Sequence, residues 1–487
     1  MILHLSDPNQ TISIPKNLFD ILAENARQHP HKIYFYGHEQ TVTYRQMVEE
    51  SIQLAEQLLE VLSTQQNLTL AVSTQSGELV LRLVWACLAA GIQLAFLPTS
   101  NDPAFIEALL DEIEASFVVT DSATLQGAAQ SISFDGLQPY GRISSSSSKT
   151  PDLDTPAFLF QTSGTTGTPK WVQVTHGQFL SAITSMKEEG CLNHAADAVA
   201  YITQPLTHSY GLSSALEYSA MGASLVLPAT VAGLGPVTHL INSPIAAKIT
   251  AVEGVPYFYA QMSRLVGRMN LPNLSHIGFG GGKLNQPAID TIKAYYPALT
   301  YSVRYGLTET PSVVSHKIFS PPYADDWSSS GSILSIYDLQ IMDEAGIPLP
   351  TGQEGEIYIA GTGLAWPYFG ETAVSPYFAT GDIGTIHPQT KELHIVGRQS
   401  AFLKIRGYRV SPETVESAIN SYADVLESRV SGKENCVVAE VVRATESVTE
   451  QTLQTYLATR LPNYIIPETI TFVDTIPKTN SGKIKRH

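Results

Sequence analysis

Residues 162–170 combine hydroxyl side chains, two glycines and a final lysine in a way that suits phosphate binding. The apolar segment Ala157 to Phe160 precedes them and predicts a buried strand that ends where the run begins. Glycine lets consecutive backbone amides turn inward around an anion, while hydroxyl groups and a lysine add donors. The spacing differs from the G-x-x-x-x-G-K-[ST] pattern. We expect a phosphate-binding loop rather than a hydroxyl-rich surface turn, formed by Thr162, Ser163, Gly164, Thr165, Thr166, Gly167 and Lys170.

Two short segments further along place acidic residues beside glycine and threonine. The first runs from Tyr305 through Gly306 and Thr308 to Glu309, and the second, residues 380–382, ends at Asp382. A carboxylate beside a hydroxyl group suits a hard cation such as magnesium that also binds phosphate oxygens. A carboxylate can also accept two hydrogen bonds from a diol. Read alone, the first segment could be a strand-to-helix turn and the second a glycine–aspartate turn between strands.

Two basic segments lie near the C-terminus. The first covers residues 397–413 and contains Arg398 and Gly407, and the second covers residues 477–483 and ends at Lys483. Without further context, such segments are more often solvated surface than part of a site.

Taken together and in this order, these segments resemble the adenylate-forming superfamily of acyl-CoA synthetases, peptide-synthetase adenylation domains and luciferases. The resemblance implies that residues 162–170 bind phosphate, Glu309 holds magnesium and Thr308 bonds the α-phosphate. It also implies that Tyr305 stacks on adenine and that Asp382 accepts hydrogen bonds from the ribose. Gly306 belongs to the same nucleotide-binding segment.

The resemblance assigns the basic segments to the two half-reactions of that superfamily. Arg398 would reach the ribose or phosphate, Gly407 would let a pantetheine arm pass close to the backbone, and Lys483 would offset charge in the adenylation transition state. The sequence departs from the family pattern at two positions. Trp171 stands where a glycine is usual, and Ser400 stands at a hinge position usually held by aspartate or lysine.

The segment Gln204 to Gly211 resembles the part of the family that enters the acid-binding pocket. His208 would then polarise the carboxylate or pack on the acyl group. Alternatively, it is a structural histidine whose hydrogen bonds are satisfied within the pocket wall. Gly280, Gly281 and Gly282 would form another wall against substrate or adenine, or a strand-end turn. No acidic residue lies between positions 201 and 215. A substrate ammonium group would therefore lack a partner there. This favours an aromatic or acyl acid over an α-amino acid.

Hydrophobic periodicity predicts the helices and strands that hold these segments in place. Helical spacing at Phe19 to Arg27 and Tyr44 to Leu62 is followed by alternating short apolar strands and helices, which is typical of a mostly parallel sheet. From about Ile333 short strands predominate, and the last part has its own helix–strand pattern. The fold class predicted is α/β, with a large N-terminal domain at 1–396 that includes a β-rich subdomain. A hinge at 397–400 and a small mobile α+β domain at 401–487 complete the chain.

Composition narrows the function further. The 487 residues carry a formal net charge of −16, which argues against nucleic acid or anionic membrane as a partner. The stretch Leu79 to Leu97 contains Arg82, so we expect a buried helix and strand there rather than a membrane span. Three separated cysteines and the absence of a signal-like N-terminus indicate the cytoplasm.

These observations predict a ligase that uses ATP and Mg²⁺ to convert a small carboxylic acid into its acyl-AMP. The acyl group would pass to a thiol, either coenzyme A or the phosphopantetheine of a separate acyl carrier protein. Three alternatives remain open. They are a luciferase-type oxidoreductase, a stand-alone enzyme that activates an amino acid, and a catalytically silent binding protein with the same fold.

Overall fold

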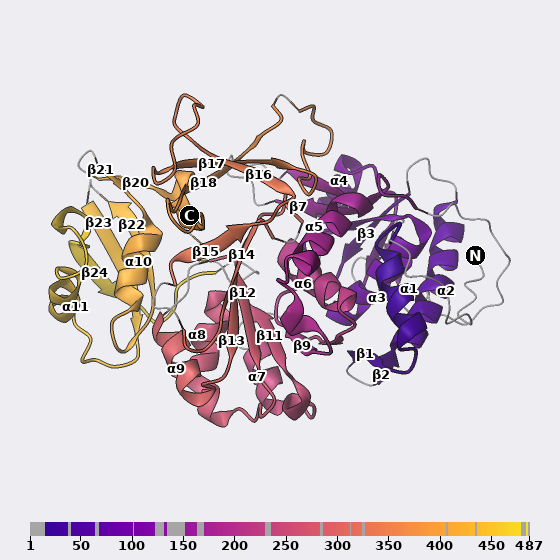
Figure 1. Cartoon of the computed structure of the whole chain (residues 1–487), viewed down its shortest axis with the longest axis horizontal. Helices are drawn as coiled ribbons and strands as arrows, with labels where there is room; N and C mark the ends of the chain where they lie inside the picture. The colour runs from indigo at the N-terminus through magenta and orange to yellow at the C-terminus, as the bar shows by residue number, and fades with distance from the viewer. Residues whose placement is uncertain are drawn as a thin grey trace.

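The computed structural model describes residues 15–37, 40–63, 68–100, 102–121, 131–133, 151–162, 170–228, 235–282, 286–311, 313–323, 327–373, 375–405, 408–433, 436–478 and 484–485. Within these ranges the chain forms two large sheets, two small ones and the helices that cover them (Figure 1). None of the described helices is both long and apolar enough to cross a lipid bilayer.

A six-stranded sheet forms the N-terminal part, with every pairing parallel except the last. Its strand order is β6 (Ser131–Ser133), β5 (Val118–Thr120), β3 (Thr69–Ser73), β4 (Gln93–Phe96), β7 (Pro156–Gln161) and β8 (Trp171–Thr175). The helices of this region are α1 (Phe19–Gln28), α2 (Tyr44–Leu62), α3 (Gly77–Ala90), α4 (Pro103–Glu112), α5 (His176–Glu188) and α6 (Ser209–Ala220).

Local sequence signals explain where these helices begin. Thr43 caps α2 by accepting from the Gln46 amide, while the Gln46 side chain accepts from the Thr43 amide. Helix α3 ends at Gly91, whose φ of 68° suits a glycine C-cap. Its buried residues and those of β4 lie in the main apolar core, so the Leu79–Leu97 stretch is a buried helix followed by a strand, as predicted.

A thirteen-stranded sheet runs through the rest of the large domain. Its order is β16 (Tyr337–Met342), β17 (Gly355–Gly361), β18 (Phe378–Ile386), β19 (Leu393–Arg398), β15 (Ser329–Ile333), β14 (Ser315–Phe319), β13 (Thr300–Tyr305), β12 (His276–Gly280), β11 (Ala251–Gly254), β9 (Val199–Ile202), β10 (Ser224–Val226), β1 (Ile33–Tyr36) and β2 (Thr41–Thr43). Pairing is parallel from β13 through β12, β11, β9 and β10 to β1, and antiparallel from β13 to β16. The antiparallel part is the predicted β-rich subdomain.

Three further helices accompany the parallel part: α7 (Gly235–Asn242), α8 (Pro256–Leu265) and α9 (Gln286–Tyr295). Short 3₁₀ segments lie at Asn193–Ala195, Ala246–Lys248, Val266–Arg268, Gln399–Ala401 and Asn463–Ile465. The single strand predicted over Ile333 to Met342 is wrong in detail. The chain turns at residues 334–336, where Tyr337 N–H donates to Leu334 O, so β15 and β16 are separate strands.

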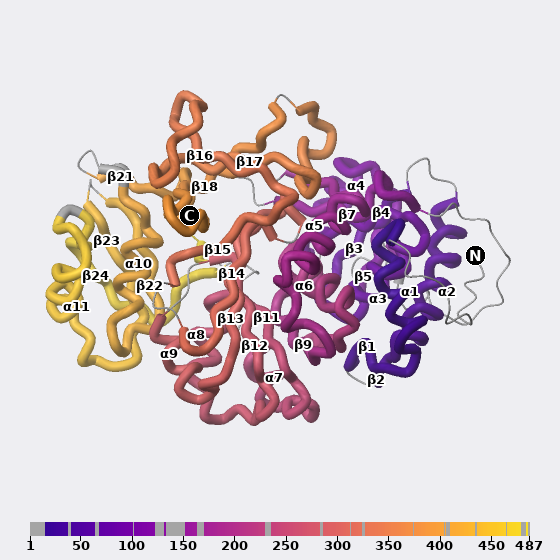
Figure 2. The backbone as a smooth tube through the Cα atoms, in the orientation of Figure 1, coloured from indigo at the N-terminus to yellow at the C-terminus, as the bar shows by residue number. Residues whose placement is uncertain are grey.

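The C-terminal part has its own small core. It contains the hairpin β20 (Leu403–Ile405) and β21 (Tyr408–Val410), the sheet β22 (Val425–Lys433), β23 (Cys436–Arg443) and β24 (Thr469–Phe472), and helices α10 (Pro412–Asn420) and α11 (Glu450–Leu457). Figure 2 shows this part beside α8 and α9 of the large domain. The predicted α/β fold with a large N-terminal and a small C-terminal α+β domain is confirmed. The predicted limits at 396 and 401 stay a prediction.

Candidate active site

The antiparallel hairpin of β7 and β8 holds both ends of the predicted phosphate-binding loop. Thr162 N–H donates to Lys170 O at 2.8 Å, and Lys170 N–H lies 3.3 Å from Thr162 Oγ1. The two residues therefore lie side by side at the base of the loop. The remaining predicted loop residues lie outside the described residues; they are Ser163, Gly164, Thr165, Thr166 and Gly167.

Trp171, the departure from the family pattern, is anchored directly after this loop. Its side chain is 6% exposed, and its indole N–H donates to Glu112 Oε2 on α4 at 3.0 Å. Phe369 N–H donates to Trp171 O at 2.8 Å. The large ring thus ties the strand that follows the loop to a neighbouring helix and to the segment around residue 369.

Lys170 and Glu309 are brought together by Tyr368. Lys170 Nζ lies 2.9 Å from Glu371 Oε1 and 4.6 Å from the centre of the Tyr368 ring. The Tyr368 hydroxyl donates to Glu309 Oε1 at 2.7 Å. Burial and the Glu309 charge raise the pKa of Tyr368, so its phenol remains a donor. A cation and a buried carboxylate therefore contact the same aromatic residue. A lysine suits phosphate, and a carboxylate suits magnesium.

Thr308 and His208 lie at the junction between this group and helix α6. Thr308 Oγ1 is 3.5 Å from the hydroxyl of Ser209, the first residue of α6. His208 immediately precedes α6 and lines a cavity of about 220 Å³. Gln161, just before the phosphate-binding loop, lines the same cavity. The structure thus places His208 and the loop base around one hollow.

The segments around Tyr305 and Asp382 come from different strands and meet through their side chains. The Tyr305 hydroxyl donates to Asp382 Oδ2 at 2.8 Å, and Arg398 Nε lies 2.8 Å from Asp382 Oδ1. Arg398 also donates to Thr380 O at 3.2 Å. Asp382 and Arg398 are direct partners in the β18–β19 pairing, so strand register sets their contact.

These residues line one cavity of about 570 Å³. Gly281, Gly282 and Gly306 form part of its wall, together with Tyr305, Asp382 and Arg398. Gly281 has a φ of 74°, which only glycine adopts without strain, at the turn that follows β12. Gly280, the last residue of β12, packs closely on the neighbouring strand, because a Cβ there would be 3.2 Å from Arg304 O and 3.6 Å from Tyr210 Cζ.

Lys483 and Gly407 lie outside the described residues. The residue after Lys483, Ile484, lines a third cavity, of about 420 Å³, together with Gly281 and Gly282. The end of the small domain is therefore placed next to the glycine wall of the large domain.

Comparison with known proteins agrees with this geometry. Residues 22–369 match the family described as AMP-binding enzyme, and residues 414–483 match the AMP-binding enzyme C-terminal domain. The chain belongs to the AMP-binding enzyme family. This confirms the predicted adenylate-forming superfamily and the prediction of a ligase-type enzyme.

Relatives of this AMP-binding enzyme include a CoA ligase, a peptide synthetase and a luciferin 4-monooxygenase of Nipponoluciola cruciata. The 2-succinylbenzoate–CoA ligase of Bacillus subtilis (strain 168) is 27% identical, and the match covers 96% of each chain. Gramicidin S synthase 2 of Brevibacillus brevis is also 27% identical over 98% of this chain, which corresponds to only 11% of that much longer protein. O-succinylbenzoate coenzyme A synthetase from Bacillus subtilis, solved with ATP and magnesium ion, superposes with a TM-score of 0.79 at 25% identity. That match covers 96% of this chain and 98% of the solved one.

The AMP-binding enzyme also contains a buried ion cluster that sequence reasoning missed. Arg304 Nη1 lies 2.6 Å from Glu217 Oε2, and Arg304 Nη2 lies 3.2 Å from Glu253 Oε1. Tyr210 and Tyr218 donate to Glu253 at 3.2 and 3.0 Å. Burial opposes the charge of Arg304, but the two carboxylates together raise its pKa. The available signal was Glu253 in β11, whose other residues are apolar or glycine.

The group His194, Glu253 and His276 has ligand atoms within 4.8 Å of one another, close enough to resemble a metal centre. Two of its three residues, His276 and Glu253, already have polar partners. His276 Nδ1 and Nε2 lie 2.7 and 3.0 Å from the hydroxyls of Thr300 and Ser302. Glu253 is already paired with a cation, Arg304. We therefore assign the group to the buried ion cluster rather than to a metal site.

Proposed function

We propose that this enzyme joins ATP and a small carboxylic acid to give acyl-AMP and pyrophosphate, then transfers the acyl group to a pantetheine thiol. The observation that carries the proposal is the pair of adjoining groups around Tyr305 and Glu309. Tyr305, Asp382 and Arg398 line a cavity of about 570 Å³. Glu309, four positions after Tyr305, accepts from Tyr368, and Lys170 lies over the ring of that same tyrosine. One group suits a nucleoside and the other its phosphates.

The donor set fits ATP and magnesium. Tyr305 and Arg398 orient the Asp382 carboxylate, and a two-oxygen acceptor suits the paired hydroxyls of a ribose. Glu309 has an oxygen besides the one that accepts from Tyr368. Magnesium typically uses one or two carboxylates together with phosphate oxygens and water, and when bound it would neutralise phosphate charge. The solved relative with ATP and magnesium supports this choice.

In the first half-reaction, an oxygen of the acid carboxylate attacks the α-phosphorus. The bond from the α-phosphorus to the bridging oxygen breaks, and pyrophosphate leaves with the electron pair. Lys170 would exchange Glu371 for a phosphate of ATP, Thr308 would donate to the α-phosphate, and Lys483 would offset the developing negative charge.

The acid itself should be compact, either aromatic or a short acyl acid. Tyr210 lies beside Gly280 and donates to Glu253, which pairs with Arg304. A long alkyl chain would have to displace this buried, charged group, which would be costly. The same relative has also been solved with its acyl-adenylate intermediate, which is consistent with an aromatic acid.

In the second half-reaction, a thiol sulfur attacks the acyl carbonyl, AMP leaves with the electron pair of the acyl–oxygen bond, and the thiol proton passes to solvent. The acceptor is coenzyme A or a carrier protein supplied as a separate chain. Full-length similarity to a CoA ligase favours coenzyme A. We place the reaction in the cytoplasm, where ATP and coenzyme A are both available.

The test is pyrophosphate release from ATP with a panel of benzoates, short and long alkanoates and amino acids. We expect release with at least one compact acid and a thioester when coenzyme A is added. Release without a thioester would direct the search to carrier proteins, and light emission in oxygen would favour the luciferase-type reaction. If every acid in the panel fails to release pyrophosphate, the proposal is wrong.

A further inference from the structure

One lysine of the small domain is held by residues from both domains. Lys478 Nζ lies 2.6 Å from Glu427 Oε2 on β22 and 3.9 Å from the centre of the Tyr257 ring on α8 of the large domain. The side chains of Lys478 and Glu427 are only 16% and 19% exposed. A cation over an aromatic ring is worth more when it is shielded from water, so this contact is suited to hold the domains in one orientation.

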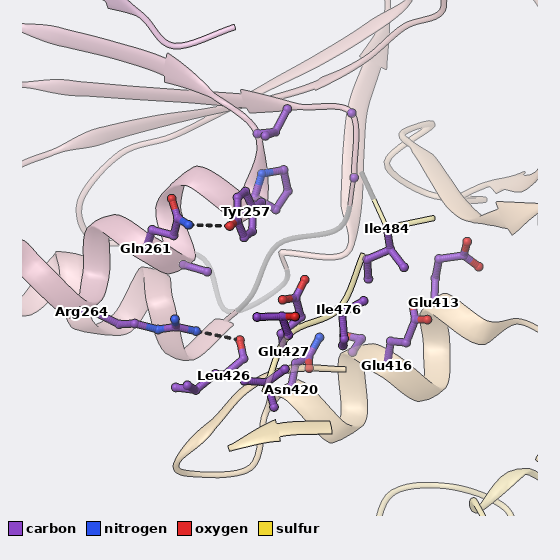
Figure 3. A pocket seen from close by; sticks show the side chains of 18 of the residues that line it. Tyr257, Gln261, Arg264, Glu413, Glu416, Asn420, Leu426, Glu427, Ile476 and Ile484 are labelled. Atoms are coloured by element: carbon purple, nitrogen blue, oxygen red, sulfur yellow. Dashed lines mark hydrogen bonds between the residues drawn. The ribbon is translucent and has the colours of Figure 1, made fainter. Parts of the chain in front are cut away.

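Neighbouring contacts support the same interface. The Tyr257 hydroxyl accepts from Gln261 Nε2 at 2.5 Å, which fixes the ring on α8. About two turns beyond Tyr257 on α8, Arg264 Nη2 donates to Leu426 O of β22 at 3.1 Å, so this helix also bonds directly to the small domain (Figure 3). Burial raises the pKa of Tyr257, and Glu427 adds to this effect, so the ring stays neutral beneath the lysine.

The residues that follow the 479–483 segment are also held by hydrogen bonds. Lys478 forms an isolated antiparallel bridge with Ile484, and Lys485 N–H donates to Pro477 O at 2.9 Å. Arg429 on β22 donates to Lys485 O at 3.0 Å. Residues on either side of the 479–483 segment are therefore fixed to each other and to β22. The contact of Lys478 with Tyr257 then fixes this assembly to the large domain.

We propose that Lys478, Tyr257 and Glu427 form an interdomain clamp that positions the terminal loop for acyl-AMP formation and has to open for thioester formation. The inference rests on the proposed function, because Lys483, the lysine proposed for adenylation, lies five positions after Lys478. Tyr257 belongs to the large domain and Glu427 to the small one, so rotation of the small domain separates them. The clamp therefore favours the first step at the expense of the second.

The experiment compares Lys478→Met and Tyr257→Leu with the parent enzyme. Pyrophosphate exchange measures the first step, and thioester formation from supplied acyl-AMP and coenzyme A measures the second. We expect kcat for exchange to fall about tenfold in both variants with little change in KM for ATP, as loss of a shielded cation–π contact and ion pair implies. Thioester formation from supplied acyl-AMP should be unchanged or faster.

Two further variants serve as controls. Lys478→Arg retains a cation that can contact both Tyr257 and Glu427, so it should recover most of the exchange activity. Lys293→Met removes a comparable lysine on α9, whose Nζ lies 4.6 Å from the centre of the Tyr323 ring and 3.6 Å from Asp290 Oδ1. That lysine makes no described contact with the small domain, so this variant should behave like the parent in both assays.

The result that overturns the clamp is an equal loss of both half-reactions, or no loss, in Lys478→Met and Tyr257→Leu. Hydrogen exchange of residues 256–265 and 425–433 gives a readout that does not depend on activity. Lys478→Met should lose protection in both segments while Lys293→Met does not, and unchanged protection would also overturn the clamp. A parent enzyme that releases no pyrophosphate with any acid would instead count against the proposed function.

Discussion

Asp382 accepts from Tyr305 and pairs with Arg398, so its carboxylate is oriented before any nucleotide binds. We predict that Asp382→Ala raises KM for ATP at least tenfold, since two charge-assisted hydrogen bonds to ribose are worth about 1.5–3 kcal/mol each. The variant should also discriminate less between ATP and its 2′- and 3′-deoxy analogues. Steady-state pyrophosphate release with the three nucleotides measures both effects.

Lys187→Ala, a change on the exposed side of α5, is the matched control and should leave both values unchanged. If Asp382→Ala keeps the parent's full preference for ribose, the carboxylate has another role, such as holding Arg398 alone.

Candidate site residues could be predicted from the sequence where they lie in short contiguous motifs. Tyr305, Asp382 and Arg398 were each singled out, and the structure brings them into one cavity. Tyr368 and Glu371 were not assigned a role, because their partners Glu309 and Lys170 are distant in the chain. A single sequence does not reveal these side-chain contacts between distant residues, because they depend on the order of the strands in the sheet.

Helix α6 and strands β11 and β13 meet in a buried ionic contact between Glu217, Glu253 and Arg304. We predict that Arg304→Met lowers the free energy of unfolding by about 3–5 kcal/mol, because it leaves Glu217 and Glu253 buried without their cation. Urea unfolding followed by circular dichroism measures this change.

Lys32→Met removes a pair with exposed Asp197 and is the control, with an expected cost of about 0–1 kcal/mol. A cost for Arg304→Met as small as that of the control would mean that the cluster is not a structural anchor.

Histidine burial gives a prediction about pH. His176, the first residue of α5, is fully buried, and its Nδ1 accepts from Leu18 N–H at 3.1 Å. Burial lowers its pKa to about 4, against an ordinary value of 6.5. Between these values the unfolded chain binds the proton and the folded chain does not, so stability falls as pH drops from about 6.5 towards 4.

Up to about 1.4 kcal/mol per pH unit is attributable to such a group in that window. His176→Asn, whose side-chain oxygen can still accept from Leu18, should therefore show a shallower decline in urea midpoint between pH 6.5 and 5 than the parent. Parallel declines in the two proteins would show that His176 does not drive the acid sensitivity.

Elements with strong local signals were predicted closely. The helix Tyr44 to Leu62 has the predicted bounds, because its apolar spacing and its Thr43–Gln46 capping box act within the segment. The break between β15 and β16 was missed because residues 333–342 contain no glycine or proline that would signal a turn. Pairing partners were also not predictable, since β15 lies between β14 and β19, which is distant in the chain.

On the scale of the whole molecule, the predicted hinge at Gly397 to Ser400 links the end of β19 to a 3₁₀ turn. Gly397 is close-packed against the start of the small domain, because a Cβ there would lie 2.9 Å from Ser411 Oγ and 3.0 Å from Glu413 Oε2. A larger residue at 397 would therefore force the ends of these two side chains to shift.

The two half-reactions should be separable by a change at Gly407, which lies outside the described residues. We predict that Gly407→Trp blocks the path of pantetheine, so acyl-AMP accumulates and thioester formation falls at least tenfold while pyrophosphate release continues. Single-turnover experiments that quantify acyl-AMP and thioester separately provide the measurement. A proportional loss of both products would contradict a dedicated thiol path.

Tyr305, Asp382 and Arg398 stand on β13, β18 and β19 of a single thirteen-stranded sheet. Hydrogen-bonded neighbours connect these strands without a break through β14 and β15. The residues that would hold the nucleoside are thus part of the same cooperative unit as the sheet itself, in contrast to a site built on separate loops. Consequently, a bound nucleotide should stabilise the sheet that carries these residues against unfolding by mass action.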